Sequence, residues 1–250
     1  MRPFAPLLDL GVAFALLTRL PLPRLPDAAF AAQARAVWAF PLVGLCTGAL
    51  AGGAGLLALA AGLPAGVAAG LVLAVQVIVT GAMHEDGLAD AADGLWGGFT
   101  PERRLEIMRD SRIGSYGVLA LILSLGLRWQ AVAVLLPHGA WPVILAAVGS
   151  RAMMPALMRA LPHARADGLS KGVGRPGGGA VLLGAALALG LGLALGGAVA
   201  LPVLVAGGVM AVLAGALARA RIGGQTGDIL GATQQLAEIA MLLVCIAQLS

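Results

Sequence analysis

Residues 180–200 read AVLLGAALALGLGLALGGAVA, and no side chain in this run carries a charge. A helix needs about 20 predominantly apolar residues to cross the hydrocarbon core of a bilayer. Of the 250 residues in the whole chain, 60% are hydrophobic and 11% are charged. An average soluble domain has roughly a quarter of its residues charged. The sequence therefore predicts an all-α, polytopic helical membrane protein.

Six further apolar runs accompany this one along the chain. The seven predicted spans are Trp38–Ala60, Ala65–Met83, Ser115–Leu136, Trp141–Leu157, Ala180–Ala200, Pro202–Ala218 and Ile229–Leu249. An eighth element, Phe4–Thr18, is short and holds Asp9, so it can span, re-enter or lie flat at the interface. We expect one membrane domain over residues 1–250, with about seven or eight membrane-embedded helices and no soluble module.

Lysine and arginine gather in alternate connections between the predicted spans. By the positive-inside rule, these connections lie in the cytoplasm. The loops at residues 84–114, 161–178 and 219–228 then open on one side of the membrane, and we expect this side to be the active face. The net charge of +4 is explained by this topology, so we expect lipid and small molecules as partners and no nucleic acid. The sequence leaves open a homo-oligomer.

Seven of the twelve acidic residues lie between Glu85 and Asp110, beside a long apolar run. Residues 84–94 read HEDGLADAADG; if they are helical, Asp86, Asp90 and Asp93 share one face. Carboxylates crowded at a membrane edge repel each other unless a cation neutralises them, and oxygen ligands favour Mg²⁺ or Mn²⁺ over zinc. The alternative is a solvated acidic helix end. We predict a metal site with the ligands Glu85, Asp86, Asp90, Asp93 and Asp228.

A basic segment follows the acidic one. Leu105 and Met108 have the spacing of an amphipathic surface helix that Gly114 can end. On such a helix Arg109 and Arg112 share a face and can bind phosphate oxygens bidentately. The alternative is that they pair with the acidic residues and with lipid headgroups. Lys171, the single lysine of the chain, lies in a later basic loop and is a second candidate for a phosphate contact.

The last predicted span carries a polar stripe. Asp228, Gln235 and Glu238 recur at helical spacing and must face protein or water, because lipid does not tolerate them. We interpret Asp228 as a metal or substrate ligand. Glu238 either supports the site or forms a structural interhelical hydrogen bond. Of the two arginines inside predicted spans, we expect Arg151 to face the bundle and pair with Glu238 or a phosphate, and Arg128 to extend toward an interface.

Five segments together resemble the cobalamin synthase family, the adenosylcobinamide-GDP ribazoletransferases. They read TRLPLP at residues 18–23, FPLVG at 40–44, HEDGLADAADG at 84–94, MRDSRIG at 108–114 and GGQTGDILGA at 223–232. They occur in order over nearly the whole chain, and the acidic segment and the DSRIG segment are the most specific. Glu85 stands where an apolar residue is expected in many members, so its role is less secure than that of its neighbours.

The resemblance implies a Mg²⁺-dependent transferase. Such enzymes join adenosylcobinamide-GDP to α-ribazole or its 5′-phosphate, releasing GMP and forming adenosylcobalamin or its 5′-phosphate. The carboxylates would then hold Mg²⁺ against the pyrophosphate, and Asp93 or Asp90 would act catalytically on the attacking hydroxyl. The expected substrate-binding residues are Arg109, Asp110, Ser111, Arg112, Lys171, Gly224 and Thr226.

Two other classes of membrane protein compete with this interpretation. A CDP-alcohol phosphotransferase has an Ala-Arg pair after Asp-Gly, whereas Ala89-Asp90 follows Asp86-Gly87 here. A cation-coupled secondary transporter would use charges near the membrane midplane, often on broken helices in related halves. Most acidic residues of this chain instead form one cluster at a membrane edge. GMP release separates the favoured function from both alternatives, and ion flux without substrate would indicate the transporter.

Overall fold

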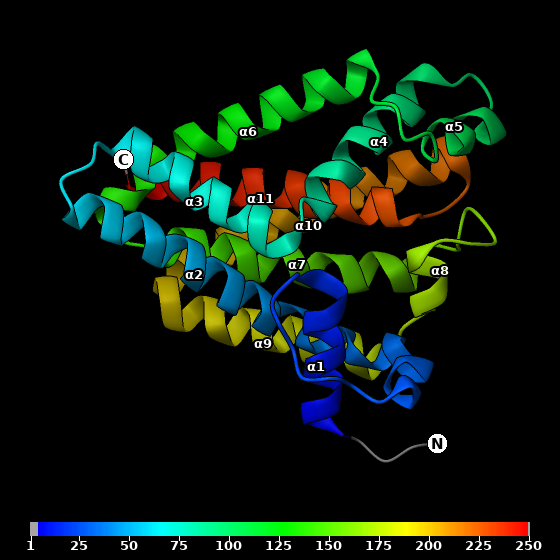
Figure 1. The fold of residues 1–250 in the computed structure, drawn as a ribbon, viewed down its shortest axis with the longest axis horizontal. Helices are drawn as coiled ribbons and strands as arrows, with labels where there is room; N and C mark the ends of the chain where they lie inside the picture. The colour runs from blue at the N-terminus through cyan, green and yellow to red at the C-terminus, as the bar shows by residue number, and fades with distance from the viewer. Residues whose placement is uncertain (1–4, 250) are drawn as a thin grey trace.

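The computed structural model describes residues 5–249, and every regular element in that range is helical, as predicted (Figure 1). The α-helices are α1 (Pro6–Leu17), α2 (Phe40–Ala60), α3 (Ala65–Thr80), α4 (Met83–Gly97), α5 (Pro101–Ile107), α6 (Ser115–Leu135), α7 (Trp141–Ala160), α8 (Leu169–Val173), α9 (Gly178–Gly196), α10 (Ala200–Ile222) and α11 (Gly227–Leu249). Three 3₁₀ elements join them: η1 (Asp27–Ala39), η2 (Leu136–His138) and η3 (Gly197–Val199).

Within residues 5–249, five helical stretches are long and apolar enough to cross a membrane, or six if the bent pair α3 and α4 counts as one. One stretch, Gly178–Ile222, has 45 residues, which at 1.5 Å per residue is about twice a bilayer core. It contains both α9 and α10, which η3 separates and which pack against each other and against α7. The seven predicted spans thus correspond to five or six stretches of spanning length, with α9 and α10 falling within a single stretch and α3 having only 16 residues.

The span expected at Ala65–Met83 does not continue to its predicted end. Helix α3 ends at Thr80, and both Gly81 (φ 65°) and Ala82 (φ 57°) adopt the left-handed conformation. Glycine adopts this conformation easily, whereas alanine does so at a cost. The chain turns by 88° between α3 and α4. The acidic segment therefore lies on a separate helix, outside the five spanning stretches.

Helix α1 answers the question that the sequence leaves open about the N-terminal element. Its 12 residues extend about 18 Å, which is too short to cross a bilayer. Figure 1 shows α1 running across the direction of the long helices. Buried Asp9 receives hydrogen bonds from the Arg35 guanidinium at 2.8 and 3.0 Å and fastens α1 to η1. Phe4, where the element was expected to begin, lies outside the described residues.

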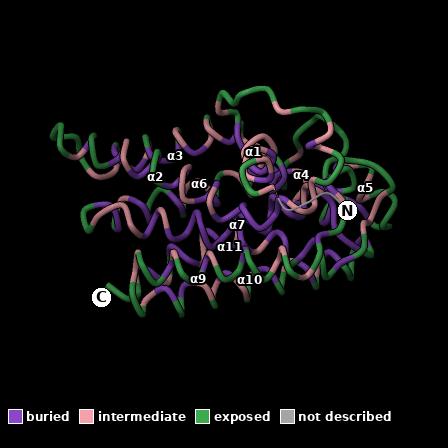
Figure 2. Tube along the Cα trace, turned by 90° about the horizontal axis from the view of Figure 1, so that it is seen from below, coloured by how far each residue is buried: buried purple, intermediate pink, exposed green. Residues whose placement is uncertain are grey.

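Helices α7 and α11 form the centre of the bundle. In the most apolar stretch of 18 residues in each helix, 72% of α7 and 67% of α11 is buried. The corresponding stretch of Ser115–His138, which includes α6, is 28% buried. Figure 2 shows the same contrast in buried and exposed trace. The long helices around the centre thus expose more of their apolar side chains, while α7 and α11 are covered by protein.

The polar connections lie together at one end of the bundle. In Figure 1, α4, α5 and α8 lie at the end opposite the C-terminus. This grouping agrees with the predicted one-sided distribution of the loops at 84–114, 161–178 and 219–228. Which compartment this end faces stays a prediction.

Candidate functional site

The site is built where α4 crosses α11. A Cβ atom added at Gly87 would lie 3.0 Å from the Asp228 carbonyl oxygen and 3.2 Å from the Gly231 Cα atom. One added at Gly231 would lie 3.3 Å from the His84 carbonyl oxygen. Both glycines therefore let the helices approach closely, since a Cβ atom at either position would force its neighbour to shift by a few tenths of an ångström. The close approach brings Asp86 and Asp90 of α4 to Asp228 at the start of α11.

These three carboxylates influence each other. Burial, followed by the charges of Asp86, Asp228 and Asp93, raises the pKa of Asp90 to about 7. One positive charge meets this group: Arg165 Nη2 donates a hydrogen bond of 3.1 Å to Asp228 Oδ2. Ionising all three carboxylates together is unfavourable without additional positive charge. The group has the chemistry of a site for a hard cation.

Among residues 5–249, no three His, Cys, Asp or Glu side chains lie close enough to form a complete metal site. Mg²⁺ is usually held by one or two carboxylates, several waters and the phosphates of a substrate. Asp86, Asp90 and Asp228 fit that kind of binding, because they supply oxygen ligands only and repel each other.

A short backbone contact positions Asp228. The Gln225 amide donates to the Pro162 carbonyl at 2.9 Å, and the Ala164 amide donates to the Gln225 carbonyl at 3.0 Å. Gly224 permits this approach, because a Cβ atom there would collide with the Pro162 carbonyl. Thr226 Oγ1 accepts a hydrogen bond from the Ile229 amide and lies 3.1 Å from Asp228 Oδ2. In this structure, the predicted substrate residues Gly224 and Thr226 thus hold the first turn of α11 in place.

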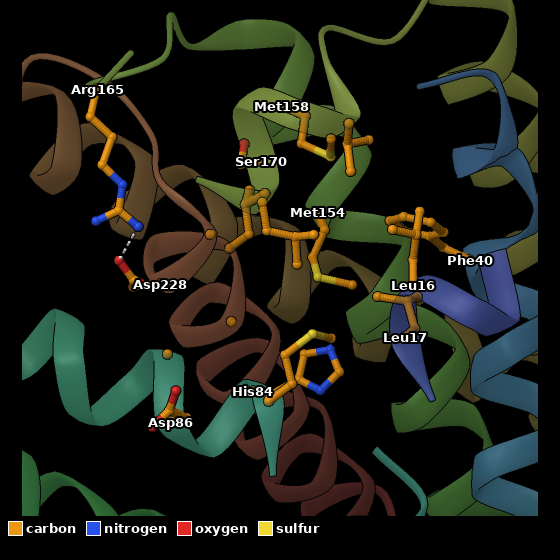
Figure 3. A pocket seen from close by; sticks show the side chains of 17 residues that line it. Leu16, Leu17, Phe40, His84, Asp86, Met154, Met158, Arg165, Ser170 and Asp228 are labelled. Carbon is orange, nitrogen blue, oxygen red and sulfur yellow. Dashed lines mark hydrogen bonds and ion pairs between the residues drawn. The ribbon is translucent and has the colours of Figure 1, made fainter. Parts of the chain in front are cut away.

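A cavity of about 230 Å³ opens beside the carboxylates (Figure 3). Its polar lining includes Asp86, Asp228, Arg165 and Ser170, and its apolar lining includes Leu16, Leu17, Phe40, Met154, Met158 and Val173. The apolar side chains come from α1, α2, α7 and α8, and the carboxylates from α4 and α11. The cavity can therefore receive a ligand with one apolar part and one polar or charged part.

The structure does not place Glu85 or Asp93 with the other predicted metal ligands. Glu85 is turned into the bundle, where Arg128 Nη1 lies 2.8 Å from its Oε1. Asp93 lies near Asp90, but its two oxygens accept the backbone amides of Gly114 at 2.7 Å and Gly117 at 2.9 Å. Gly114 directly precedes α6 and Gly117 lies in its first turn, so Asp93 binds the N-terminal end of that helix. Of the predicted set, Asp86 and Asp228 line the cavity, whereas Glu85, Asp90 and Asp93 do not. Asp90 stays with the group because the charges of Asp86 and Asp228 act on its carboxylate.

Arg128 does not extend toward an interface as expected. Only 1% of its side chain is exposed, and it also contacts Glu238 on α11 at 3.1 Å. Gln76 of α3 and Gln235 of α11 accept hydrogen bonds from the same guanidinium at 2.8 and 2.7 Å. The physical reason is that an arginine deep in a bundle is stabilised by buried carboxylates more than by a distant headgroup. One cation thus joins α3, α4, α6 and α11.

Glu238 and Arg151, the other two charged residues inside the predicted spans, also lie in the interior of the bundle. Gln76 Nε2 donates to Glu238 Oε1 at 3.2 Å, so the structural interhelical hydrogen bond proposed for Glu238 is confirmed. Arg151 faces the bundle, as expected, and is buried. Its guanidinium donates to the Ala147 carbonyl of its own helix at 3.1 Å, and no ion pair with Glu238 forms.

The basic segment after α4 is only partly helical. Helix α5 ends at Ile107, so Arg109 and Arg112 do not share a helical face as expected. Arg109 pairs with Asp167, and Arg112 pairs with Asp110 at 2.9 Å. Ser111 and Lys171 are exposed. None of the expected phosphate contacts in residues 109–112 lines the cavity, nor does Lys171; their role in substrate binding stays a prediction.

Sequence reasoning missed several residues that line the cavity. Arg165 was one of many basic loop residues, and its pairing with Asp228 spans 63 positions of sequence. His84 was not among the predicted site residues, yet it is buried in the cavity wall. The apolar lining from α1 and α7 gave no signal, because such residues are everywhere in this chain.

The chain matches known proteins over nearly its whole length. The family model described as cobalamin-5-phosphate synthase matches residues 9–246. Similar curated proteins named adenosylcobinamide-GDP ribazoletransferase come from Bradyrhizobium diazoefficiens (48% identical, covering 96% of this chain and 93% of the relative) and Mesorhizobium japonicum (42% identical, 97% and 94%). No solved structure matches the chain significantly. By its sequence, the protein therefore belongs to the cobalamin-5-phosphate synthase family.

Proposed function

We propose that this chain joins adenosylcobinamide-GDP to α-ribazole or α-ribazole 5′-phosphate and releases GMP. A hydroxyl oxygen of the ribazole forms a bond to the phosphorus next to the corrinoid. The bond between that phosphorus and the oxygen of the GMP group breaks, and the hydroxyl proton is released. The family match and the names of the similar proteins support this reaction.

The observation that carries the proposal is the meeting of Asp86, Asp90 and Asp228 beside a cavity that is apolar on its other side. We propose that these carboxylates hold Mg²⁺. When bound, the cation would neutralise charge on the diphosphate. The helix crossing at Gly87 and Gly231 sets the spacing of the carboxylates before any ligand arrives, which reduces the reorganisation needed on binding.

Other residues in and around the cavity have separate tasks in this proposal. Arg165 is held by Asp228 and lies within reach of a phosphate oxygen beside the carboxylates. Met154, Met158 and Phe40 form a wall that excludes water and receives an apolar ring system. Asp93 keeps α4 and α6 in register through the two amides that it accepts. In this scheme α4 contributes both ligands and its own structural support.

The proposal includes a location in the bacterial inner membrane with the site at the cytoplasmic face. The grouping of the polar loops at one end of the bundle supports a single active face. The arginine-rich connections at that end favour the cytoplasm by the positive-inside rule.

The test is GMP release by purified protein in lipid nanodiscs, supplied with both substrates, with Mg²⁺ or with a chelator. We expect turnover only with the metal. Asp90→Asn should lower turnover at least about 100-fold, as loss of a charged group at a phosphoryl-transfer site does. The matched control is Glu102→Gln, because Glu102 is an exposed residue of α5 away from the cavity.

Three results would count against the proposal. Asp90→Asn with normal turnover would remove the carboxylates from the reaction. CMP release from a CDP-alcohol in place of GMP release would favour a CDP-alcohol phosphotransferase. Ion flux into liposomes without either substrate would favour a transporter.

A further inference from the structure

A second cavity of about 170 Å³ adjoins the first. It is lined by Ala15, Leu16, Thr18, Arg19, Thr80, Met83 and Leu169. Three of these residues, Leu16, Met83 and Leu169, also line the first cavity. The two cavities thus meet at these three side chains. Thr18 and Arg19 come from the TRLPLP segment, to which no role has been given so far.

Arg19 borders this cavity with an exposed side chain, and its backbone is anchored to α3. Its backbone amide donates to the Val79 carbonyl at 2.7 Å, which ties the segment to the end of α3. Its side chain lies across Gly81: a Cβ atom added there would come within 2.8 Å of Arg19 Cγ and Nε. Gly81 also has a φ of 65°. The same glycine therefore turns the chain toward α4 and makes room for the arginine.

Arg19 is the charged residue of this lining, and it forms no ion pair with any acidic residue among positions 5–249. The two threonine hydroxyls beside it donate to carbonyls of their own helices, Thr18 to Phe14 at 2.8 Å and Thr80 to Gln76 at 2.9 Å. Arg165 in the first cavity differs, because Asp228 already neutralises it. The guanidinium of Arg19 thus has donors available for an anion from outside the protein.

The charges separate two kinds of phosphate. A phosphate that reacts must lie at Asp86, Asp90 and Asp228, where a cation can bind. A phosphate that does not react is repelled by those carboxylates and is stabilised elsewhere, at an unpaired cation. Of the proposed substrates, α-ribazole 5′-phosphate carries such a group. We propose that the second cavity, through Arg19, binds the 5′-phosphate of the acceptor, while the first cavity holds its aromatic base.

This inference rests on the proposed transferase function, and it makes the protein selective for the phosphorylated acceptor. The test measures KM for three substrates separately in nanodiscs: α-ribazole 5′-phosphate, α-ribazole and adenosylcobinamide-GDP. For Arg19→Ala we expect KM for the phosphorylated acceptor to rise about 10- to 100-fold, the effect of losing hydrogen bonds from a charged group. The other two KM values should stay within about twofold.

Two variants serve as controls for Arg19→Ala. Arg24→Ala removes the exposed arginine that directly follows this segment and lines neither cavity, and it should leave all three KM values unchanged. Arg19→Lys keeps the charge but not the planar fork, so it should raise KM for the phosphorylated acceptor less than Arg19→Ala does. Calorimetric binding of α-ribazole 5′-phosphate gives a readout that needs no turnover, and Arg19→Ala should weaken it by the same factor.

Three results would overturn the assignment. KM could rise equally for both acceptors, it could rise for adenosylcobinamide-GDP instead, or no KM and no binding constant could change. The proposed transferase is judged separately, by whether the unaltered protein releases GMP at all. If it does not, the binding measurement still decides whether Arg19 recognises the phosphate.

Discussion

Removing the charge of Arg128 should destabilise the bundle strongly. Arg128 contacts Glu85 at 2.8 Å and Glu238 at 3.1 Å, with 1% of its side chain exposed. With Arg151 nearby, the cluster has two cations and two carboxylates, so Arg128→Met changes its net charge from zero to −1. Breaking a buried ion pair by removing one partner costs about 3–5 kcal/mol. We expect the variant to lose about this much free energy of unfolding.

The assay is thermal unfolding of the purified protein in nanodiscs. For a chain of this size, about 2–4 °C of Tm is lost per kcal/mol, so Arg128→Met should lower Tm by roughly 6–20 °C. Adding Glu85→Gln restores a neutral cluster that still contains Arg151 and Glu238. The double variant should therefore lose less free energy of unfolding than the sum of the losses in the two single variants. The difference, the coupling energy, should be roughly 1–3 kcal/mol.

The matched control is Leu127→Met, a change on the exposed surface of the same helix, which should leave Tm within about 2 °C. Two outcomes would refute the reasoning about the cluster. Arg128→Met could unfold at the temperature of the unaltered protein, or the effects of Arg128→Met and Glu85→Gln could simply add.

Three further predictions concern the site and its supports. Gly87→Ala places a Cβ atom 3.0 Å from the Asp228 carbonyl oxygen and should lower GMP release about tenfold by separating α4 from α11. The control Gly53→Ala, whose added Cβ atom meets nothing within 4 Å, should retain full activity. Equal activity in the two variants would contradict the argument that α4 and α11 must approach closely. Asp93→Ala removes two hydrogen bonds at the start of α6 and should lower the free energy of unfolding by about 2–3 kcal/mol. Hydrogen exchange at the Gly114 and Gly117 amides should become faster. Unchanged exchange would show that Asp93 does not cap α6. Burial, then the charges of Lys171 and Arg175, lowers the pKa of His163. Its contribution to stability is therefore present above the ordinary histidine pKa of about 6.5 and is lost as pH falls through the lowered value. His163→Gln should reduce this loss of Tm at acidic pH, and an unchanged dependence of Tm on pH would refute the role of His163.

The sequence predicts the helical class and most crossings, because the bilayer imposes its thickness on the chain. A run such as residues 180–200 has no alternative that satisfies its backbone groups in lipid. The prediction was wrong at the end of α3, where Ala65–Met83 reads as one apolar run. Two consecutive left-handed residues, Gly81 and Ala82, turn the chain there. Hydropathy does not report backbone conformation, so this turn could not be read from composition.

The acidic residues show the same limit within the site. Spacing places Asp86, Asp90 and Asp93 on one face of a helix, and α4 is that helix. Spacing does not say which partner each carboxylate meets. Asp93 meets the amides of α6, Glu85 meets Arg128, and only Asp86 and Asp90 face the start of α11. Those partners are 21 to more than 140 positions away in sequence.

By itself, the sequence determined that the chain crosses a membrane several times, which family it resembles and which polar segments carry the chemistry. Each of these follows from local composition or from short motifs. Only the tertiary structure decided that Asp228 and Arg165 complete the group on α4, that Arg128 is a buried link and that Arg19 lines a second cavity. The physical reason is that these relations depend on how closely helices approach, which Gly81, Gly87 and Gly231 permit through the side chains that they lack.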